Sequence, residues 1–132
     1  MSPEAAASGA ATLLVVDDDR KTRKLIRLLL ENAGYWVLEA AGGEEAVELL
    51  RSQPEAIDLV LLDLVMPHMS GQECLRQMLE LKPGLKAFAV TAYTLDYEAY
   101  EAISSQVQAL LPKPLRPPLL LTLVQRVLSG EA

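Results

Sequence analysis

Two carboxylate-bearing segments, a hydroxyl and an ammonium group each follow a short apolar run in this 132-residue sequence. The triplet Asp17–Asp19 and the single Asp63 supply the carboxylates, Thr91 the hydroxyl and Lys113 the ammonium. Crowded carboxylates repel one another unless a hard cation joins them, and oxygen-only ligands select Mg²⁺ or Mn²⁺. A carboxylate can also act as a nucleophile and form an acyl phosphate. If these groups meet in the fold, they suit magnesium-assisted phosphoryl transfer.

Each residue type has a use in that reaction. Phosphoryl transfer requires in-line positioning and neutralisation of the charge on the moving group. Bound Mg²⁺ would neutralise one phosphoryl oxygen, Lys113 can pair with a second, and the Thr91 hydroxyl can donate to a third. Magnesium keeps several waters and needs only one or two carboxylates from the protein, which leaves a coordination place for a phosphoryl oxygen.

The surrounding sequence alternates between two patterns. Short apolar runs predict strands covered on both faces, at residues 13–16, 35–39, 57–62, 85–90 and 109–111. Helical spacing and helix start and stop signals predict helices at residues 20–33, 44–51, 72–81, 96–105 and 118–128. In the first helix the spacing of Leu25, Leu28, Leu29 and Ala33 supports the prediction, and Gly34 is placed to end it.

Five strand–helix pairs predict an α/β fold with a doubly wound, five-stranded parallel sheet between two helical layers, a flavodoxin-like sandwich. Right-handed crossovers favour the strand order 2-1-3-4-5. In such sheets ligands bind at the carboxyl ends of the strands, where the polar residues above are expected. We expect one domain over residues 12–130, preceded by a flexible lead or linker remnant over residues 1–11.

Four motifs on these predicted strand ends resemble the receiver domain of bacterial two-component response regulators, the family of the chemotaxis protein CheY. They are Leu-Val-Val-Asp17-Asp18-Asp19, Leu-Leu-Asp63-Leu-Val-Met-Pro67-His-Met-Ser-Gly71, Val-Thr91-Ala92 and Lys113-Pro114. The resemblance covers about residues 12–129. Each motif alone is weak, but the four in this order are highly specific.

The resemblance implies a phosphoacceptor rather than a turnover enzyme. Asp63 would accept a phosphoryl group from a phosphohistidine on a histidine kinase or histidine phosphotransfer protein. Asp18 would bind Mg²⁺ directly and Asp17 through water, while Asp63 and the Val65 backbone carbonyl would complete the protein ligands. Phosphorylation would then be relayed as a conformational change.

Other positions refine this expectation. Thr91 and Lys113 would sense the phosphoryl group, whereas Asp19, one place beyond the matched pair, is expected to cap the following helix. The family usually has Tyr or Phe three residues before the lysine, and here that residue is Leu110. This departure puts the standard aromatic switch in doubt, though not the phosphate chemistry.

Two features are candidates for contact with partners. A basic cluster follows the acidic triplet and has two interpretations, a solvated face that balances the triplet or a docking surface for the phosphodonor, with Leu25 and Ile26 as apolar contacts. Its members are Arg20, Lys21, Arg23, Lys24 and Arg27. Tyr93, Tyr97 and Tyr100 form a stripe at helical spacing, which indicates either packing or a surface for a homodimer or effector.

Three rival functions deserve comparison. An aspartate-based phosphohydrolase typically needs a second Asp two residues after the nucleophile, where this chain has Val65. A nucleotide switch would need a Gly-rich phosphate loop after the first strand, where the chain has acidic residues. A pseudo-receiver, a binding module that has lost the chemistry, is the alternative that Leu110 keeps open.

Composition limits the possible partners and location. The formal net charge of −6 speaks against direct binding of nucleic acid, whose phosphates demand the opposite sign. No apolar run approaches the roughly 20 residues needed to span a bilayer. The single Cys74 cannot form an internal disulfide, which suits a reducing compartment. We therefore expect a cytoplasmic protein that does not insert into membranes.

Overall fold

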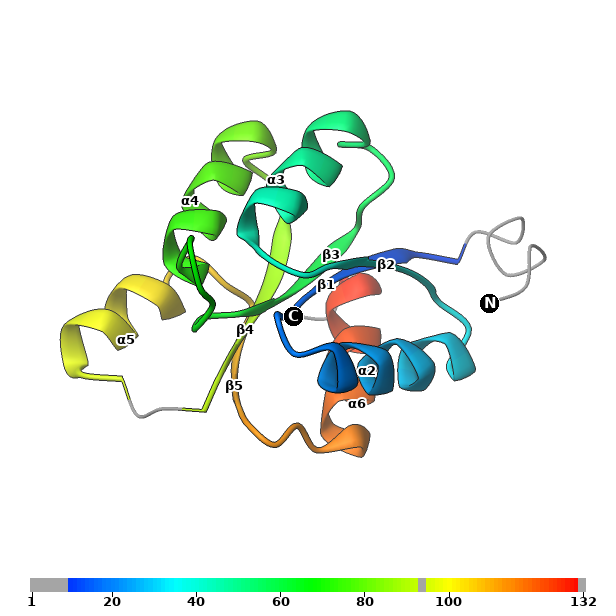
Figure 1. The fold of residues 1–132 in the computed structure, drawn as a ribbon. Helices are drawn as coiled ribbons and strands as arrows, with labels where there is room; N and C mark the ends of the chain where they lie inside the picture. Colours follow the sequence, from blue (N-terminus) through cyan, green and yellow to red (C-terminus); the bar gives the residue numbers. More distant parts are fainter. Residues whose placement is uncertain (1–9, 93–94, 131–132) are drawn as a thin grey trace.

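The computed structural model describes residues 10–92 and 95–130, where five strands alternate with five helices (Figure 1). The strands are β1 (Thr12–Val16), β2 (Trp36–Ala40), β3 (Leu59–Asp63), β4 (Lys86–Thr91) and β5 (Ala109–Pro112). The helices are α2 (Arg20–Asn32), α3 (Gly43–Ser52), α4 (Gly71–Leu81), α5 (Tyr97–Ser104) and α6 (Pro117–Leu128). All ten predicted elements are present, and their bounds differ from the predicted ones by at most two residues.

The five strands form one parallel sheet in the order β2-β1-β3-β4-β5. This order confirms the predicted doubly wound fold. The chain runs from β1 to β2 at one edge and then crosses to β3 on the other side of β1, so the direction of winding switches between β1 and β3. The carboxyl end of the sheet at this switch point is where doubly wound folds bind ligands.

Alternate residues of each strand face opposite helical layers because side chains in a strand alternate between the two faces. Leu14 and Val16 of β1 belong to a core that includes residues of α3, α4 and α5. Leu13 and Val15 of the same strand belong to a second core with residues of α2 and α6. Figure 1 shows α3 and α4 on one side of the sheet and α2 and α6 on the other. The central strands are buried on both faces, as their apolar sequences predict.

Burial and the sequence pattern differ at two places. Ile57 is fully buried, yet β3 begins only at Leu59. Its apolar character reflects burial in the loop before the strand rather than a place in the sheet. In α2 the inner face is formed by Ile26 and Leu30, whereas Leu25 and Leu28 of the predicted apolar stripe are exposed.

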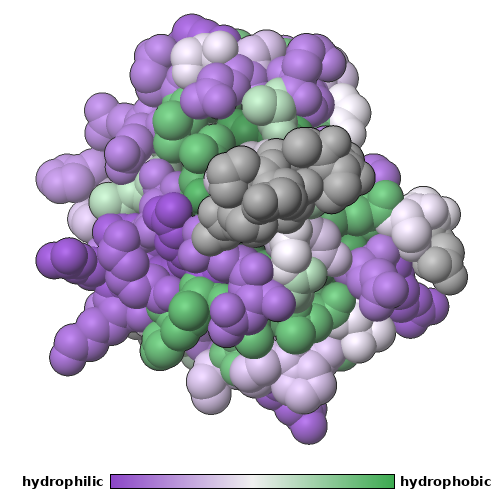
Figure 2. All heavy atoms as spheres, turned by 90° about the vertical axis from the view of Figure 1, so that its right-hand side faces the viewer, coloured by the Kyte–Doolittle hydropathy of each residue, from purple (hydrophilic) through white to green (hydrophobic). Residues whose placement is uncertain are grey.

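The outer surface agrees with this layering. Figure 2 shows hydrophilic side chains over much of the face that it displays, with apolar residues in smaller patches between them. Among the described residues, no helix is both long and apolar enough to cross a membrane.

A cluster of charges joins α2 to the edge strand β2. The Glu39 carboxylate, 10% exposed, accepts hydrogen bonds from Arg23 at 2.8 Å, Lys24 at 2.9 Å and Arg27 at 2.8 Å. Burial opposes ionisation of Glu39, but the hydrogen bonds from Arg27, Lys24 and Arg23 outweigh it and lower its pKa to about 2. Three of the five basic residues in the cluster therefore compensate a carboxylate on β2, a role that neither interpretation from the sequence included.

A loop over residues 64–70 connects Asp63 at the end of β3 with α4. The Gly71 amide donates to the Leu64 carbonyl at 3.0 Å, and the Ser70 hydroxyl caps the helix by accepting from the Glu73 amide at 3.1 Å. A Cβ atom on Gly71 would lie 2.5 Å from Leu64 Cα and 2.6 Å from the Asp63 carbonyl oxygen. Only glycine lets α4 begin this close to the strand end.

Gly71→Ala is therefore expected to destabilise the protein by at least about 2 kcal/mol, because backbone atoms of β3 must move to admit the methyl group. Urea unfolding measures this change. Gly84→Ala is the matched control, since a Cβ atom there meets nothing within 4 Å, and it should change stability by less than about 1 kcal/mol. Equal effects of the two substitutions would contradict the steric argument.

Glu39→Gln should lower the free energy of unfolding at neutral pH by about 2–3 kcal/mol, because it removes a carboxylate whose ionised form the fold stabilises. A carboxylate with a depressed pKa stabilises the fold fully above its ordinary pKa of 4.5, and this contribution is lost as the pH falls toward about 2. The difference between wild type and Glu39→Gln should accordingly shrink across that window in urea unfolding series. A difference that is independent of pH would count against the charge cluster.

Candidate functional site

The acidic residues predicted from the sequence meet at the carboxyl ends of β1 and β3. These strands are neighbours in register, with Val16 opposite Leu62, so the residues that follow them lie side by side. Carboxylate oxygens of Asp17, Asp18 and Asp63 all lie within 4.8 Å of one another. Asp17 and Asp63 are 2% and 6% exposed, whereas Asp18 is exposed. The result is an acidic pocket with two buried walls and one face open to solvent.

Lys113 compensates the two buried carboxylates. Its ammonium group donates to Asp17 Oδ2 at 3.0 Å and to Asp63 Oδ2 at 3.1 Å. The residue follows β5, and its backbone amide donates to the Thr91 carbonyl at 2.9 Å. Burial lowers the pKa of the Lys113 ammonium, and its contacts with Asp17 and Asp63 outweigh this and raise the pKa above its usual value. Lys113 is thus the cation of this site.

Asp63 has a perturbed acidity. Burial raises the pKa of the Asp63 carboxyl above its ordinary value, and the nearby charge of Asp17 acts in the same direction. The Val65 amide, which donates to Asp63 Oδ1 at 3.0 Å, and Lys113 act against this rise. The carboxylate is therefore held by one amide and one ammonium group while its own desolvation makes it more basic.

Thr91 and Val65 lie at the same end of the sheet. Thr91 ends β4 and is buried, next to β3, where Asp63 is opposite Val90. Val65 is half-exposed, and its backbone amide faces Asp63 as described above. The fold thus brings to one edge the strand ends that carry the residues proposed from the sequence for phosphate chemistry, namely Asp17, Asp18, Asp63, Val65, Thr91 and Lys113.

The loop after β1 is ordered by the acidic triplet itself. Asp17 Oδ1 accepts from the Asp19 amide at 2.8 Å. The Asp19 carboxylate in turn caps α2 by accepting from the Thr22 amide at 3.0 Å and from the Thr22 hydroxyl. The expected capping role of Asp19 is confirmed, and it explains why this carboxylate stays outside the pocket.

Arg23 is a contact of this site that the sequence did not single out for such a role. Its guanidinium donates to the Asp17 backbone carbonyl through Nη1 at 2.8 Å and to Glu39 through Nε at 2.8 Å. The side chain is 13% exposed, so it is not part of a solvated basic face. The available sequence signal was Glu39, a charged residue in a largely apolar strand that needs a nearby cation.

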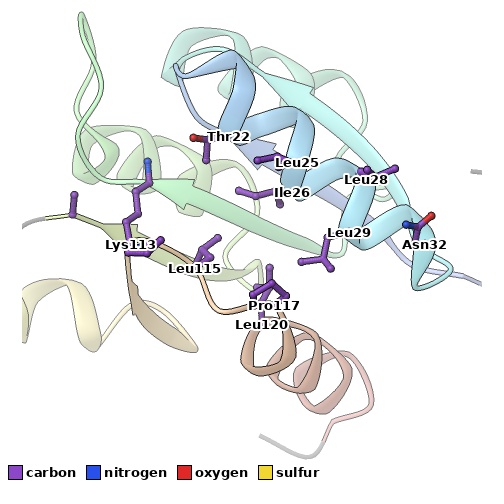
Figure 3. Close-up of a pocket in the computed structure, with 12 residues that line it drawn as sticks. Thr22, Leu25, Ile26, Leu28, Leu29, Asn32, Lys113, Leu115, Pro117 and Leu120 are labelled. Atoms are coloured by element: carbon purple, nitrogen blue, oxygen red, sulfur yellow. The ribbon is translucent and has the colours of Figure 1, made fainter.

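A groove of about 750 Å³ adjoins the site between α2 and the segment that leads into α6 (Figure 3). Figure 3 shows Leu25, Ile26 and Leu29 of α2 across from Leu115, Pro117 and Leu120, with Lys113 toward one end. Leu25 is 68% exposed, whereas Ile26 is buried. Of the two apolar contacts expected from the sequence, only Leu25 is available to a partner without rearrangement.

The remaining candidates lie away from the acidic pocket. Tyr97 and Tyr100 of α5 are exposed, so packing in the core does not explain them, while Tyr93 lies outside the described residues. Leu110 is partly buried against the core that faces α3, α4 and α5. Cys74 is a free cysteine buried within α4, where it packs in the same core.

The donor set of the acidic pocket fits a hard divalent cation. All three groups are carboxylates, and two of them are buried with a single ammonium group between them. Oxygen donors of this kind select Mg²⁺ or Mn²⁺ over softer metals. The exposed side of the pocket leaves room for the waters that Mg²⁺ retains.

Comparisons with known proteins agree with this geometry. Residues 13–125 match the family model described as "Response regulator receiver domain". The chain is 36% identical over 102 residues to the sensor kinase CckA of Brucella abortus, an alignment that covers 77% of this chain but only 11% of the kinase. The activity and partners of that longer protein are therefore not transferable from the match.

Two solved structures are similar over nearly the whole chain. A CheY-like receiver domain from Methanospirillum hungatei is 30% identical, with a TM-score of 0.82 and coverage of 93% of this chain and 97% of the other. The CheX–CheY–BeF₃–Mg²⁺ complex from Borrelia burgdorferi is 27% identical, with a TM-score of 0.83 and coverage of 92% of both chains. The order of the strands, the acidic pocket and the family match together show that this chain belongs to the response regulator receiver domain family of two-component signalling systems.

Proposed function

We propose that Asp63 accepts a phosphoryl group from a phosphohistidine and that this chain relays the modification as a change of conformation. The observation that carries the proposal is the meeting of Asp17, Asp18 and Asp63 within 4.8 Å, with Lys113 bonded to the buried pair. A structural ion pair would need only one carboxylate for one lysine. The additional acidic groups indicate a pocket built for a divalent cation and a phosphoryl group.

The reaction uses groups already in place. An Asp63 carboxylate oxygen attacks phosphorus, the phosphorus–nitrogen bond to the donor imidazole breaks, and the imidazole leaves with that electron pair. Lys113 is close enough to pair with a phosphoryl oxygen, and the Thr91 hydroxyl would donate to another. Asp18, the exposed member of the acidic cluster, marks the side of the pocket from which the donor would approach.

Asp17, Asp18, Asp63 and the Val65 carbonyl are the proposed ligands of Mg²⁺. Bound Mg²⁺ would neutralise charge on the transferred group, which is the main requirement of phosphoryl transfer. The Borrelia CheY complex, whose title names both Mg²⁺ and BeF₃, supports this assignment by its similarity of fold.

Receiver domains are signalling modules rather than turnover enzymes, and we extend this to the present chain. Val65 stands where an aspartate-based hydrolase would have its general acid, so nothing at that position can protonate a leaving group. The chain would therefore assist the phosphorylation of its own Asp63 and would not turn over a phosphate ester as a substrate. A pseudo-receiver that acts only as a binding module is the alternative, and it requires that Asp63 not be phosphorylated.

Incubation with acetyl phosphate and Mg²⁺ should add one phosphoryl group to the wild type and none to Asp63→Asn, since a carboxamide cannot form the acyl phosphate. Intact-mass spectrometry measures the product. Asp58→Asn is the matched control, because Asp58 is an exposed aspartate just before the opposite end of β3, and it should be phosphorylated like the wild type. Absence of a phosphoryl group on every variant would favour the pseudo-receiver.

We further propose that the groove between α2 and α6 receives the histidine-bearing helix of a histidine kinase or phosphotransfer protein. The groove is lined mainly by apolar side chains, reaches Lys113, and has α2 as one wall. An amphipathic helix laid in it would bring a histidine to the open side of the acidic pocket. Arg20 and Lys21 are exposed nearby and can steer an acidic partner.

The test uses a phosphorylated histidine kinase that transfers its phosphoryl group to the wild type. Leu25→Asn should slow this transfer about tenfold, because burial of one leucine contributes roughly 1.5–3 kcal/mol. Phosphorylation by acetyl phosphate should be unchanged, since this small donor needs no groove. Leu119→Asn is the control, being an exposed leucine of α6 that does not line this groove. Equal transfer rates for Leu25→Asn and the wild type would place the donor elsewhere.

The surface of α5 is a second proposed contact, for an effector or a second copy of the chain. Its support is the exposure of Tyr97 and Tyr100, since exposed tyrosines are favoured at interfaces.

We assign the protein to the cytoplasm. Its lone cysteine, Cys74, is free and buried, which agrees with a reducing compartment.

A further inference from the structure

Arg23 connects two segments that the acidic pocket depends on. One edge of its guanidinium binds the Asp17 backbone carbonyl at 2.8 Å, and Nε binds Glu39 on β2 at 2.8 Å. A planar guanidinium can hold two acceptors in fixed relative directions, which a lysine ammonium on a flexible stem does not. Arg23 therefore ties the loop after β1 to the end of β2.

The Asp17 carbonyl belongs to the peptide that joins Asp17 to Asp18. Asp17 is already fixed through its side chain, which contacts Lys113 and the Asp19 amide. Asp18 is exposed, so its carboxylate owes its direction mainly to the backbone that carries it. A hydrogen bond to the preceding carbonyl fixes the plane of that peptide and with it the direction of Asp18.

Glu39 in turn orients Arg23. Its Oε1 accepts from Arg23, while its Oε2 accepts from Lys24 and Arg27, so the carboxylate is held from both sides. The strand that carries it is paired with β1, and the Asp17 amide donates to the Ala40 carbonyl at 3.2 Å. The Arg23 contact is thus part of a rigid frame around the start of the acidic triplet.

We propose that Arg23, oriented by Glu39, is a positioning residue for the Mg²⁺ site, because it fixes the peptide that directs Asp18 toward Asp17 and Asp63. The inference rests on the proposed function in taking these three aspartates as the metal ligands. It adds a residue that touches neither metal nor phosphoryl group.

The sign of the effect separates positioning from simple electrostatics. Arg23 carries a positive charge close to a cation site, so its charge alone weakens the binding of Mg²⁺. Loss of that charge without any other change would tighten binding. Positioning has the opposite consequence, since a misdirected Asp18 makes a weaker ligand.

The experiment compares Arg23→Met, Arg23→Lys and Arg27→Met by calorimetric titration of each protein with Mg²⁺ alone. Arg27→Met is the matched control, because it removes the same charge from the Glu39 cluster but leaves the contact with Asp17 in place. We expect Arg23→Met to weaken binding about tenfold or more, as for other residues that orient metal ligands. Arg27→Met should stay within about twofold of the wild type, since its charge is screened by solvent.

Arg23→Lys keeps the charge and also replaces Arg23→Met if that variant does not fold. It should bind Mg²⁺ more weakly than the wild type because one ammonium group cannot hold both acceptors in the same geometry. Arg23 variants that bind Mg²⁺ as tightly as the wild type, or equal weakening in Arg23→Met and Arg27→Met, would overturn the proposal.

A second measurement needs no metal. In the metal-free protein, hydrogen exchange at the Asp18 and Asp19 amides should be faster in the Arg23 variants than in Arg27→Met, because the loop has lost its anchor. Unchanged exchange would also overturn the proposal. This readout distinguishes a failure of the positioning role from a failure of the proposed function, which is judged by phosphorylation of Asp63.

Discussion

Crowding of like charges is the constraint from which the rest of this site follows. Asp17 and Asp63 are buried side by side at the ends of neighbouring strands, and a pair of desolvated carboxylates is unfavourable without compensation. Lys113 supplies one positive charge to both, so the site still carries more negative charge than its own lysine can balance. Binding of a divalent cation would relieve that excess. After phosphorylation of Asp63, Lys113 could exchange a carboxylate partner for a phosphoryl oxygen. The parallel sheet is what holds these charges together against their repulsion.

Much of this arrangement could be predicted from the sequence because it depends on strand ends. The apolar runs before Asp17, Asp63, Thr91 and Lys113 define where each strand stops, and parallel strands end at one edge. The order of the strands followed from right-handed crossovers, and the capping role of Asp19 from its place before a helix. Errors of one or two residues arose where burial and strand pairing diverge, as at Ile57.

The sequence was least informative about α2, where an apolar face for the core and a set of basic residues occupy the same helix. Its apolar residues extend around more of the helix than the core requires, so helical spacing alone selected Leu25 and Leu28 although Ile26 and Leu30 form the inner face. The sequence left its basic residues with two interpretations, a solvated face or a docking surface, because their acceptor, Glu39, lies on another element. Contacts between distant segments are decided by packing and cannot be derived from spacing within one helix.

The position of α2 also explains how a donor could be aligned with Asp63. The helix begins directly after the acidic triplet, is capped by Asp19, and is anchored by Arg23 to the Asp17 carbonyl and to β2. Leu25, on the same helix, lines the groove that reaches Lys113. A partner bound in the groove would therefore be held at a fixed position relative to the pocket, since α2 forms a wall of the groove and is tied to the acidic triplet by Asp19 and Arg23. In-line phosphoryl transfer depends on such alignment, because an error of about 1 Å can cost roughly a hundredfold in rate. On the proposed function, the residues that anchor α2 would thus serve the reaction without touching the group that is transferred.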